Sequence, residues 1–139
     1  MHSGAARTCV RIERPTEYIG KQGLPYFAGV SAETAGSSGL CLHMVTIPPR
    51  ARAVPHLHES HESAVYVLSG KAGMWYGEGL REHVWMHAGD FLYIPANVPH
   101  LPYNASETEP CVGIIARTDP NEQESVTVLP LADPGIAGQ

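Results

Sequence analysis

The sequence lacks the features that mark a membrane-spanning, secreted or nucleic-acid-binding chain. No apolar run in its 139 residues approaches the roughly 20 residues that cross a bilayer. Residues 1–15 contain no apolar stretch of the kind found in a signal peptide. The nine Lys and Arg are scattered singly in a chain of net charge −5, which argues against binding to nucleic acid. We therefore expect a cytoplasmic protein that binds neither nucleic acid nor membrane.

The sequence also lacks paired cysteines and helical patterning. Cys9, Cys41 and Cys111 lie too far apart for a CxxC pair or a disulfide framework, which suits buried or semi-buried thiols in a reducing compartment. No window shows a clean apolar stripe of 3.6-residue period. The 14 glycines and 12 prolines are spread along the whole chain and oppose long helices. A single, mostly β domain is the expectation.

Short apolar segments that end in turn residues predict strands. The predicted strands are Thr8–Ile12, Leu24–Val30, Leu40–Ile47, Ala64–Ser69, Ala72–Tyr76, His83–Ala88, Phe91–Ile94, Val112–Arg117 and Ser125–Leu129. Because no helices are available for crossovers, the strands should pair antiparallel in a sandwich or barrel, with a hairpin at 77–79. We predict one domain over residues 1–139, with a core from about 24 to 129 and flexible ends at 1–7 and 132–139. The small-residue segment 31–39 is expected to be a loop.

The segment 55–62 (PHLHESHE) concentrates potential metal ligands. On an extended strand His56 and His58 point to the same face, and His61 and Glu62 follow three to four residues later. Such a set of nitrogen and oxygen donors suits Zn, Fe, Mn, Ni or Cu. His100 is the best candidate for a ligand from elsewhere, because Pro95 and Pro99 fix the path to it and Asn97 tolerates a left-handed turn. His43, His83 and His87 lie on predicted strands and are interpreted as structural or pocket-lining.

These residues resemble the two motifs of the cupin superfamily. The first motif reads His56, His58, Glu62 and Gly70, and the second reads Gly89, Pro95, Asn97, His100 and Asn104, with Asn97 in place of a glycine. The resemblance covers about residues 40–117. It implies an all-β, double-stranded β-helix (a jelly-roll barrel) with one divalent transition metal inside, Zn first and Fe as the alternative. It also implies a homodimer, for which we expect the segment 24–30 to act as an apolar edge.

Two positions depart from the first motif. Arg50 stands where the motif has its first glycine, and Ser63 stands in the glutamate position, with six residues between it and Gly70. A regular strand would turn His61 inward as the fourth ligand, whereas a bulge would turn Glu62 inward. The alternatives are a four-imidazole site (His56, His58, His61, His100) and a site of three histidines and Glu62. Asn104 is expected either to support a ligand or to serve a simple turn.

Residues on the neighbouring strands suggest what the barrel would bind. Aromatic and thioether groups at 74–76 and 84–86, with the phenols of Tyr66, Tyr93 and Tyr103, suggest a pocket for a flat, partly apolar small molecule. Which of them face inward cannot be read from alternation alone.

Three functions follow from this reading. The first is Lewis-acid chemistry on an enolisable carbonyl compound, with metal-bound hydroxide or a side chain at Glu62 or His61 taking the α proton, similar to the cupin-type aromatase/cyclases of polyketide pathways. The second is a non-haem iron dioxygenase. The third is a non-catalytic module that binds metal or a small ligand.

Overall fold

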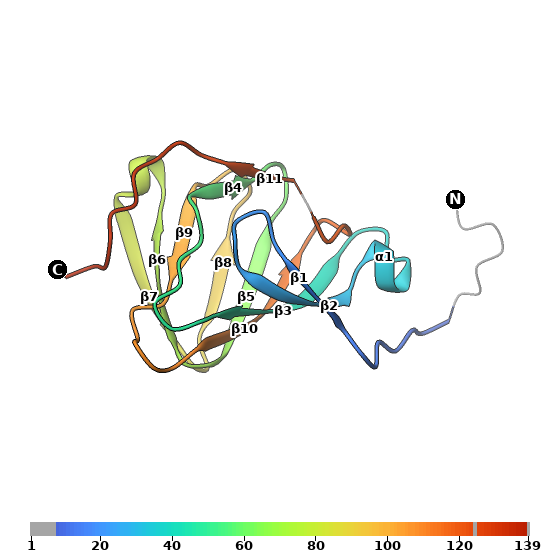
Figure 1. The fold of residues 1–139 in the computed structure, drawn as a ribbon. Coiled ribbons are helices and arrows are strands. Elements are labelled where there is room, and N and C mark those ends of the chain that lie inside the picture. The colour runs from blue at the N-terminus through green and yellow to red at the C-terminus, as the bar shows by residue number, and fades with distance from the viewer. Residues whose placement is uncertain (1–7, 124, 139) are drawn as a thin grey trace.

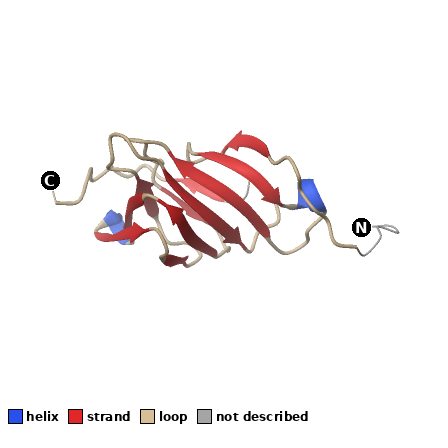
Figure 2. Cartoon of the chain, turned by 90° about the horizontal axis from the view of Figure 1, so that it is seen from below, coloured by secondary structure: helices blue, strands red, loops and turns tan. Residues whose placement is uncertain are grey.

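The computed structural model describes residues 8–123 and 125–138, which form two antiparallel sheets packed face to face (Figures 1 and 2). The first sheet has the order β1 (Thr16–Ile19), β2 (Pro25–Val30), β3 (Cys41–Ile47), β10 (Cys111–Arg117), β5 (Ser63–Ser69) and β8 (Phe91–Ile94). The second has the order β11 (Val126–Val128), β4 (His56–His58), β9 (His100–Tyr103), β6 (Lys71–Tyr76) and β7 (Glu82–His87). From β3 onward the chain passes repeatedly between the sheets, which gives the jelly roll that the sequence predicts.

Alternation along the strands places the core between the two sheets. In β10 every second residue is buried, starting at Cys111 and ending at Arg117, and the residues between them are less buried. β10 lies at the centre of its sheet, paired with β3 on one side and β5 on the other. Its inward-facing side chains therefore form one wall of the barrel interior.

Most predicted strands are confirmed within one or two residues, and the exceptions have physical causes. The prediction at Thr8–Ile12 is wrong, since these residues form no strand. β1 (TEYI) and β9 (HLPY) were not predicted, because neither shows an apolar run and Pro102 argues against a central strand. The predicted hairpin at 77–79 is confirmed: it joins β6 to β7 and contains the 3-10 turn η1 (Glu78–Leu80).

The segment 31–39, predicted to be a loop, contains a single helical turn, α1 (Ala32–Ala35). Ser31 and Thr34 form a reciprocal capping box, and Gly36 ends the turn in the left-handed conformation. This short helix is stabilised by its capping residues and has no apolar periodicity. The sequence prediction relied on apolar periodicity and therefore missed it.

The segment 24–30 is not an edge, contrary to the sequence expectation. β2 lies between β1 and β3, so β1 and β8 are the outer strands of the first sheet. The short strand β1, which was not predicted, pairs with the side of β2 that was expected to be free. The homodimer stays a prediction.

The sequence predicts a flexible segment from residue 132 onward, and this stays a prediction; in the structure its described part contacts residues of the second sheet. Asp133 accepts hydrogen bonds from the guanidinium of Arg52, and Gly135 O accepts from Trp75 Nε1 at 2.7 Å. Ile136 packs beside Tyr103, which is fully buried. Residues 1–7, also predicted to be flexible, lie outside the described residues.

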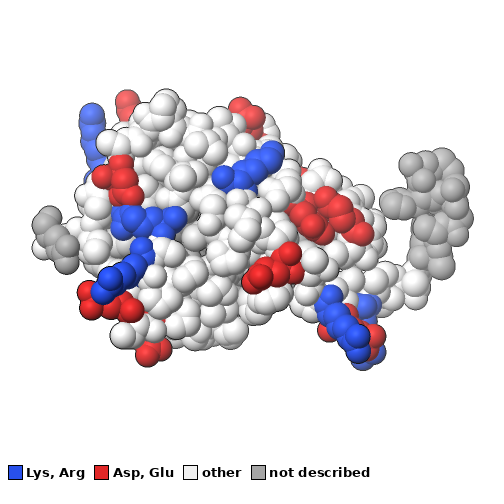
Figure 3. Space-filling view, in the orientation of Figure 1, with Lys and Arg blue, Asp and Glu red and all other residues white. Residues whose placement is uncertain are grey.

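Charged side chains are dispersed over the molecule. On the face seen in Figure 3, Lys and Arg are interspersed with Asp and Glu rather than gathered in one basic area. No helix among residues 8–123 and 125–138 is long and apolar enough to cross a membrane.

Candidate metal centre

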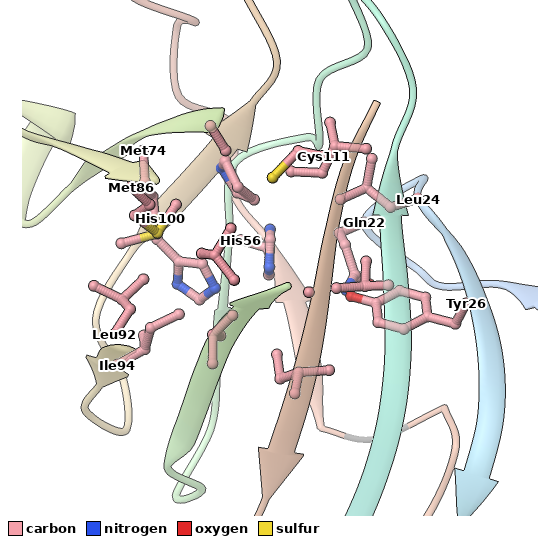
Figure 4. A pocket seen from close by; sticks show the side chains of 18 of the residues that line it. Gln22, Leu24, Tyr26, His56, Met74, Met86, Leu92, Ile94, His100 and Cys111 are labelled. Atoms are coloured by element: carbon pink, nitrogen blue, oxygen red, sulfur yellow. The ribbon is translucent and has the colours of Figure 1, made fainter. Parts of the chain in front are cut away.

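The pairing of β4 with β9 brings three histidines together inside the barrel. His56 and His100 are register partners, and His58 follows His56 on the same face of β4. The ring centroids of His56 and His100 lie 4.2 Å apart, and each lies 5.3 Å from that of His58. All three side chains are buried. Figure 4 shows His56 and His100 projecting into the cavity between the sheets.

Backbone carbonyls fix the orientation of two of these rings. His56 Nδ1 lies 2.7 Å from Val54 O, and His100 Nδ1 lies 2.9 Å from Val98 O. Because a carbonyl oxygen only accepts, Nδ1 carries the proton and donates it in both rings. The lone pair of Nε2 is therefore left for a ligand, which is the usual arrangement of a metal-binding histidine.

The surroundings keep the three imidazoles neutral. Burial lowers the pKa of His58 to about 2 and the pKa of His100 to about 4, and the charge of Arg117 acts in the same direction on both. Burial also lowers the pKa of His56 well below its usual value, with His100 as the next cause. A neutral imidazole is the form that coordinates a cation, so burial prepares the rings for metal rather than for protons.

The donor set fits a divalent transition metal. One ring nitrogen from each of His56, His58 and His100 lies within 4.8 Å of the others. Three neutral nitrogen donors suit Zn, Fe, Ni or Cu and leave coordination positions for water and substrate.

His61 and Glu62 lie outside this group of three. β5 begins only at Ser63, so the regular strand that would turn His61 inward has not yet started. His61 Nδ1 is 2.6 Å from Ser125 Oγ and 3.5 Å from Asp119 Oδ2. Glu62 is exposed, and its carboxylate accepts a hydrogen bond from Tyr93 OH at 2.7 Å. The fourth ligand and the catalytic roles of these two residues stay predictions.

The glutamate position of the motif is filled by a small residue beside a cation. Ser63 is buried and pairs in register with Arg117 of β10. Arg117 is also buried, and its Nη2 donates to Tyr26 OH at 3.1 Å. The sequence analysis missed Arg117 and Tyr26, because their approach depends on the register of three strands and leaves no local signal.

The cavity that contains the histidines is mainly aliphatic. Met74 and Met86 line it, as the sequence suggests. Trp75 and Trp85 point away from it and pack against His83 on the outer face of the second sheet. Tyr66, Tyr93 and Tyr103 do not line the histidine cavity, among the residues that the structure describes. The main aromatic group in the cavity is Tyr26.

The two substituted glycine positions keep a glycine-like backbone. Arg50 has φ of 64° and Asn97 also has φ of 64°, in the left-handed region that favours glycine. The prediction that Asn97 adopts a left-handed turn is therefore confirmed. Asn104 serves the turn rather than a ligand, since its Nδ2 donates to Ile47 O at 3.0 Å and to Glu109 O at 2.7 Å.

Fold and site together define a small jelly-roll barrel with a three-histidine centre. The family model described as a cupin domain matches residues 43–116, which run from within β3 to nearly the end of β10. The chain belongs to the cupin family.

Comparison with individual proteins agrees with this assignment. A match of 68 residues, 49% of this chain, is 35% identical to quercetin 2,3-dioxygenase of Bacillus subtilis and spans only 19% of that protein. The structure of oxalate decarboxylase from Lactobacillus farciminis aligns with a TM-score of 0.68 at 18% identity, over 83% of this chain and 33% of that one. The DMSP lyase DddQ from Ruegeria pomeroyi aligns with a TM-score of 0.67 at 14% identity, over 82% and 60%. At these identities the structural likeness shows the fold alone.

Proposed function

We propose that the chain is a metal-dependent enzyme that acts on an enolisable carbonyl compound. The observation that carries this proposal is the convergence of three buried, neutral imidazoles in an apolar cavity. A divalent ion held by His56, His58 and His100, with zinc first and iron as the alternative, would supply Lewis-acid polarisation of a carbonyl oxygen.

The shape of the interior supports a chain-like substrate. A second groove, lined by residues that include Tyr76 and Tyr93, shares Met74, Leu92 and Ile94 with the histidine cavity. A substrate could therefore place one carbonyl beside the histidines and extend its apolar part along this groove. We propose cyclisation or aromatisation of a polyketide-like molecule, because apolar walls would exclude water and hold such a chain folded.

Glu62 and His61 remain the proposed groups for removing the α proton. The carboxylate of Glu62 is held by Tyr93, which lines the second groove, so Glu62 would act on substrate from that side. His61 is supported by Ser125 and by the carboxylate of Asp119, which would stabilise it after it accepts a proton. Glu62→Gln and His61→Gln should therefore differ in turnover. The variant that loses turnover while it keeps its metal identifies the base.

Dioxygenation is the second candidate. The 35% identity to quercetin 2,3-dioxygenase over half of this chain favours it, and three histidines leave positions at iron for substrate and oxygen.

The test compares protein loaded with zinc and with iron. Exchange of α protons for deuterium in a short β-ketoacyl thioester is followed by NMR, and oxygen uptake with quercetin is followed with an electrode. Exchange with the zinc protein that needs no oxygen and is lost in His100→Ala supports the proposal. Oxygen uptake only with the iron protein supports dioxygenation instead. If His56→Ala abolishes metal binding and neither metal form transforms any probe, the non-catalytic binding module is favoured.

A further inference from the structure

The outer face of the first sheet, which is directed away from the cavity, is apolar where a solvated face would be polar. In β10 the residues that line the cavity alternate with Val112, Ile114 and Ala116, so these three side chains point outward. An antiparallel sheet with one solvated face normally alternates apolar residues with polar ones. Apolar residues at both sets of positions are typical of a strand that is covered on both faces.

Strand register joins outward side chains into a continuous row across the sheet. Phe91 of β8 pairs with Tyr66 of β5, and the two ring centroids lie 4.8 Å apart. Tyr66 pairs with Ile114 of β10. Ile114 pairs in turn with Met44 of β3, which pairs with Phe27 of β2. The row therefore has an aromatic side chain at each end and Ile114 in the middle.

Large apolar side chains on this outer face are exposed, and no charge accompanies them. The exposed fractions are 81% for Phe91, 59% for Tyr93, 53% for Leu68 and 41% for Leu42. Among the residues of β2, β3, β10, β5 and β8, all of which the structure describes, Arg117 is the only Asp, Glu, Lys or Arg, and it lines the cavity on the inner side. Within these five strands the outer face offers no charge to nucleic acid or to an anionic lipid surface, so it suits an apolar protein surface.

The size of the outer face matches what a dimer of this chain needs. With strands about 4.8 Å apart and a rise of about 3.4 Å per residue, six strands of four to seven residues cover roughly 600 Å². Two such faces packed together would bury about 1,200 Å², which reaches the range of specific protein interfaces. A small partner peptide would leave most of this area uncovered.

We propose that the outer face of the first sheet binds the same face of a second copy, in a twofold symmetric dimer whose axis passes near Ile114. Symmetric dimers use one surface on both subunits, and two sheets pack face to face about 10 Å apart through interdigitated apolar side chains. Rotation about this axis reverses the row, so Phe91 of one copy meets the partner's Phe27. The segment 24–30 thus takes part through its face and not as a strand edge. This inference does not rest on the proposed function.

The test is sedimentation velocity of the full chain, diluted from about 50 μM to about 0.05 μM to span a typical dimer affinity. Reductant is present, because Cys9 is exposed and could link two copies by a disulfide. Wild type should dimerise within this range. Phe91→Lys places an unpaired charge at both ends of the apolar interface and should raise the dissociation constant at least about a hundredfold. Val128→Lys, at a 54% exposed position of β11 in the second sheet, is the matched control and should leave the dissociation constant unchanged.

A mixed dimer tests the position of the axis. Phe27→Glu should also prevent self-association, and far-UV circular dichroism checks that this variant folds. An equimolar mixture of the Phe91→Lys and Phe27→Glu chains should dimerise, because one end pairs the two introduced charges and the other end keeps Phe91 against Phe27. A mixture of folded chains that stays monomeric contradicts an axis at Ile114. A wild-type chain that stays monomeric throughout, or a Phe91→Lys variant that dimerises as wild type does, overturns the proposal whether or not Phe27→Glu folds.

Discussion

At the scale of single residues, Arg50 keeps the left-handed backbone conformation that favours glycine, although the side chain there is arginine. Arg50 lies in the left-handed region, and its amide N donates to Ser106 O at 2.9 Å. Its side chain is exposed and, among the described residues, forms an ion pair with Glu107 alone, a surface pair that contributes little. The weak ion pair of the Arg50 side chain therefore does not offset the backbone strain at this position.

We predict that Arg50→Gly raises the free energy of unfolding by about 0.5–1 kcal/mol, because relief of left-handed strain outweighs the greater freedom of glycine in the unfolded chain. Urea denaturation measures the difference. Asn97→Gly is the matched control and should gain less, because Asn tolerates this conformation and Asn97 Oδ1 accepts a hydrogen bond from Ser60 N. A loss of stability in Arg50→Gly would contradict this account.

The sequence predicted the three central histidines but not the residues opposite them. His56 and His58 share a face through a spacing of two, and the proline-bounded turn before His100 is visible in the sequence. Arg117 and Tyr26 are 91 residues apart and meet only through the pairing of β10, β3 and β2. A local pattern cannot report such a contact. Which of His61 and Glu62 points toward the histidines likewise depends on where β5 begins, and the sequence does not show that residue.

At the scale of elements, the passage from β5 to β6 depends on Gly70. Gly70 has φ of +81°, and a Cβ atom there would lie 2.3 Å from Pro110 O, a backbone atom of the segment that enters β10. Gly89, in the turn between β7 and β8, has φ of +94° but no atom within 4 Å of such a Cβ. Both turns need a glycine with positive φ, but only Gly70 has a neighbouring backbone atom that an added Cβ would contact.

We predict that Gly70→Ala lowers the free energy of unfolding by at least about 1 kcal/mol more than Gly89→Ala does, because only the first change adds a backbone clash to the strain. Chemical denaturation of both variants measures this difference. Equal losses would show that the contact with Pro110 is easily relieved.

At this scale the apolar strands were predictable and the site strands were not. β3, β5 and β10 are seven-residue, mainly apolar segments, whereas β4 and β9 are short and carry histidine or proline where a core strand would be apolar. The histidines of the site thus replace apolar residues in β4 and β9, and the apolar pattern used to predict strands is weak there.

At the scale of the whole molecule, burial of neutral histidines makes stability depend on pH. The pKa of His43 is lowered to about 4, first by burial and then by Arg117, and the pKa values of the three central histidines are also lowered. In the unfolded chain histidines titrate near pH 6.5. Below that pH the unfolded state binds more protons than the folded state, so acid favours unfolding.

We predict that the free energy of unfolding of chelator-treated protein falls as pH drops from about 6.5 toward 4, by up to about 1.4 kcal/mol per pH unit for each such histidine. These groups should add no pH dependence above about pH 7.5. Urea denaturation across this range measures the slope, which His43→Gln should reduce. His87→Gln, at an exposed position of β7, should leave it unchanged. A flat profile would show that these rings are not held neutral.

The measurement that tests the central claim most directly is the metal content and ligand environment of the purified full chain. Elemental analysis gives the stoichiometry, and X-ray absorption gives the ligands. We predict one divalent transition metal per chain, bound through imidazole nitrogens, with loss of the ion in His56→Ala, His58→Ala and His100→Ala and retention in His87→Gln. A chain that takes up no ion under any metal supply, or that keeps its ion after all three substitutions, would contradict the account.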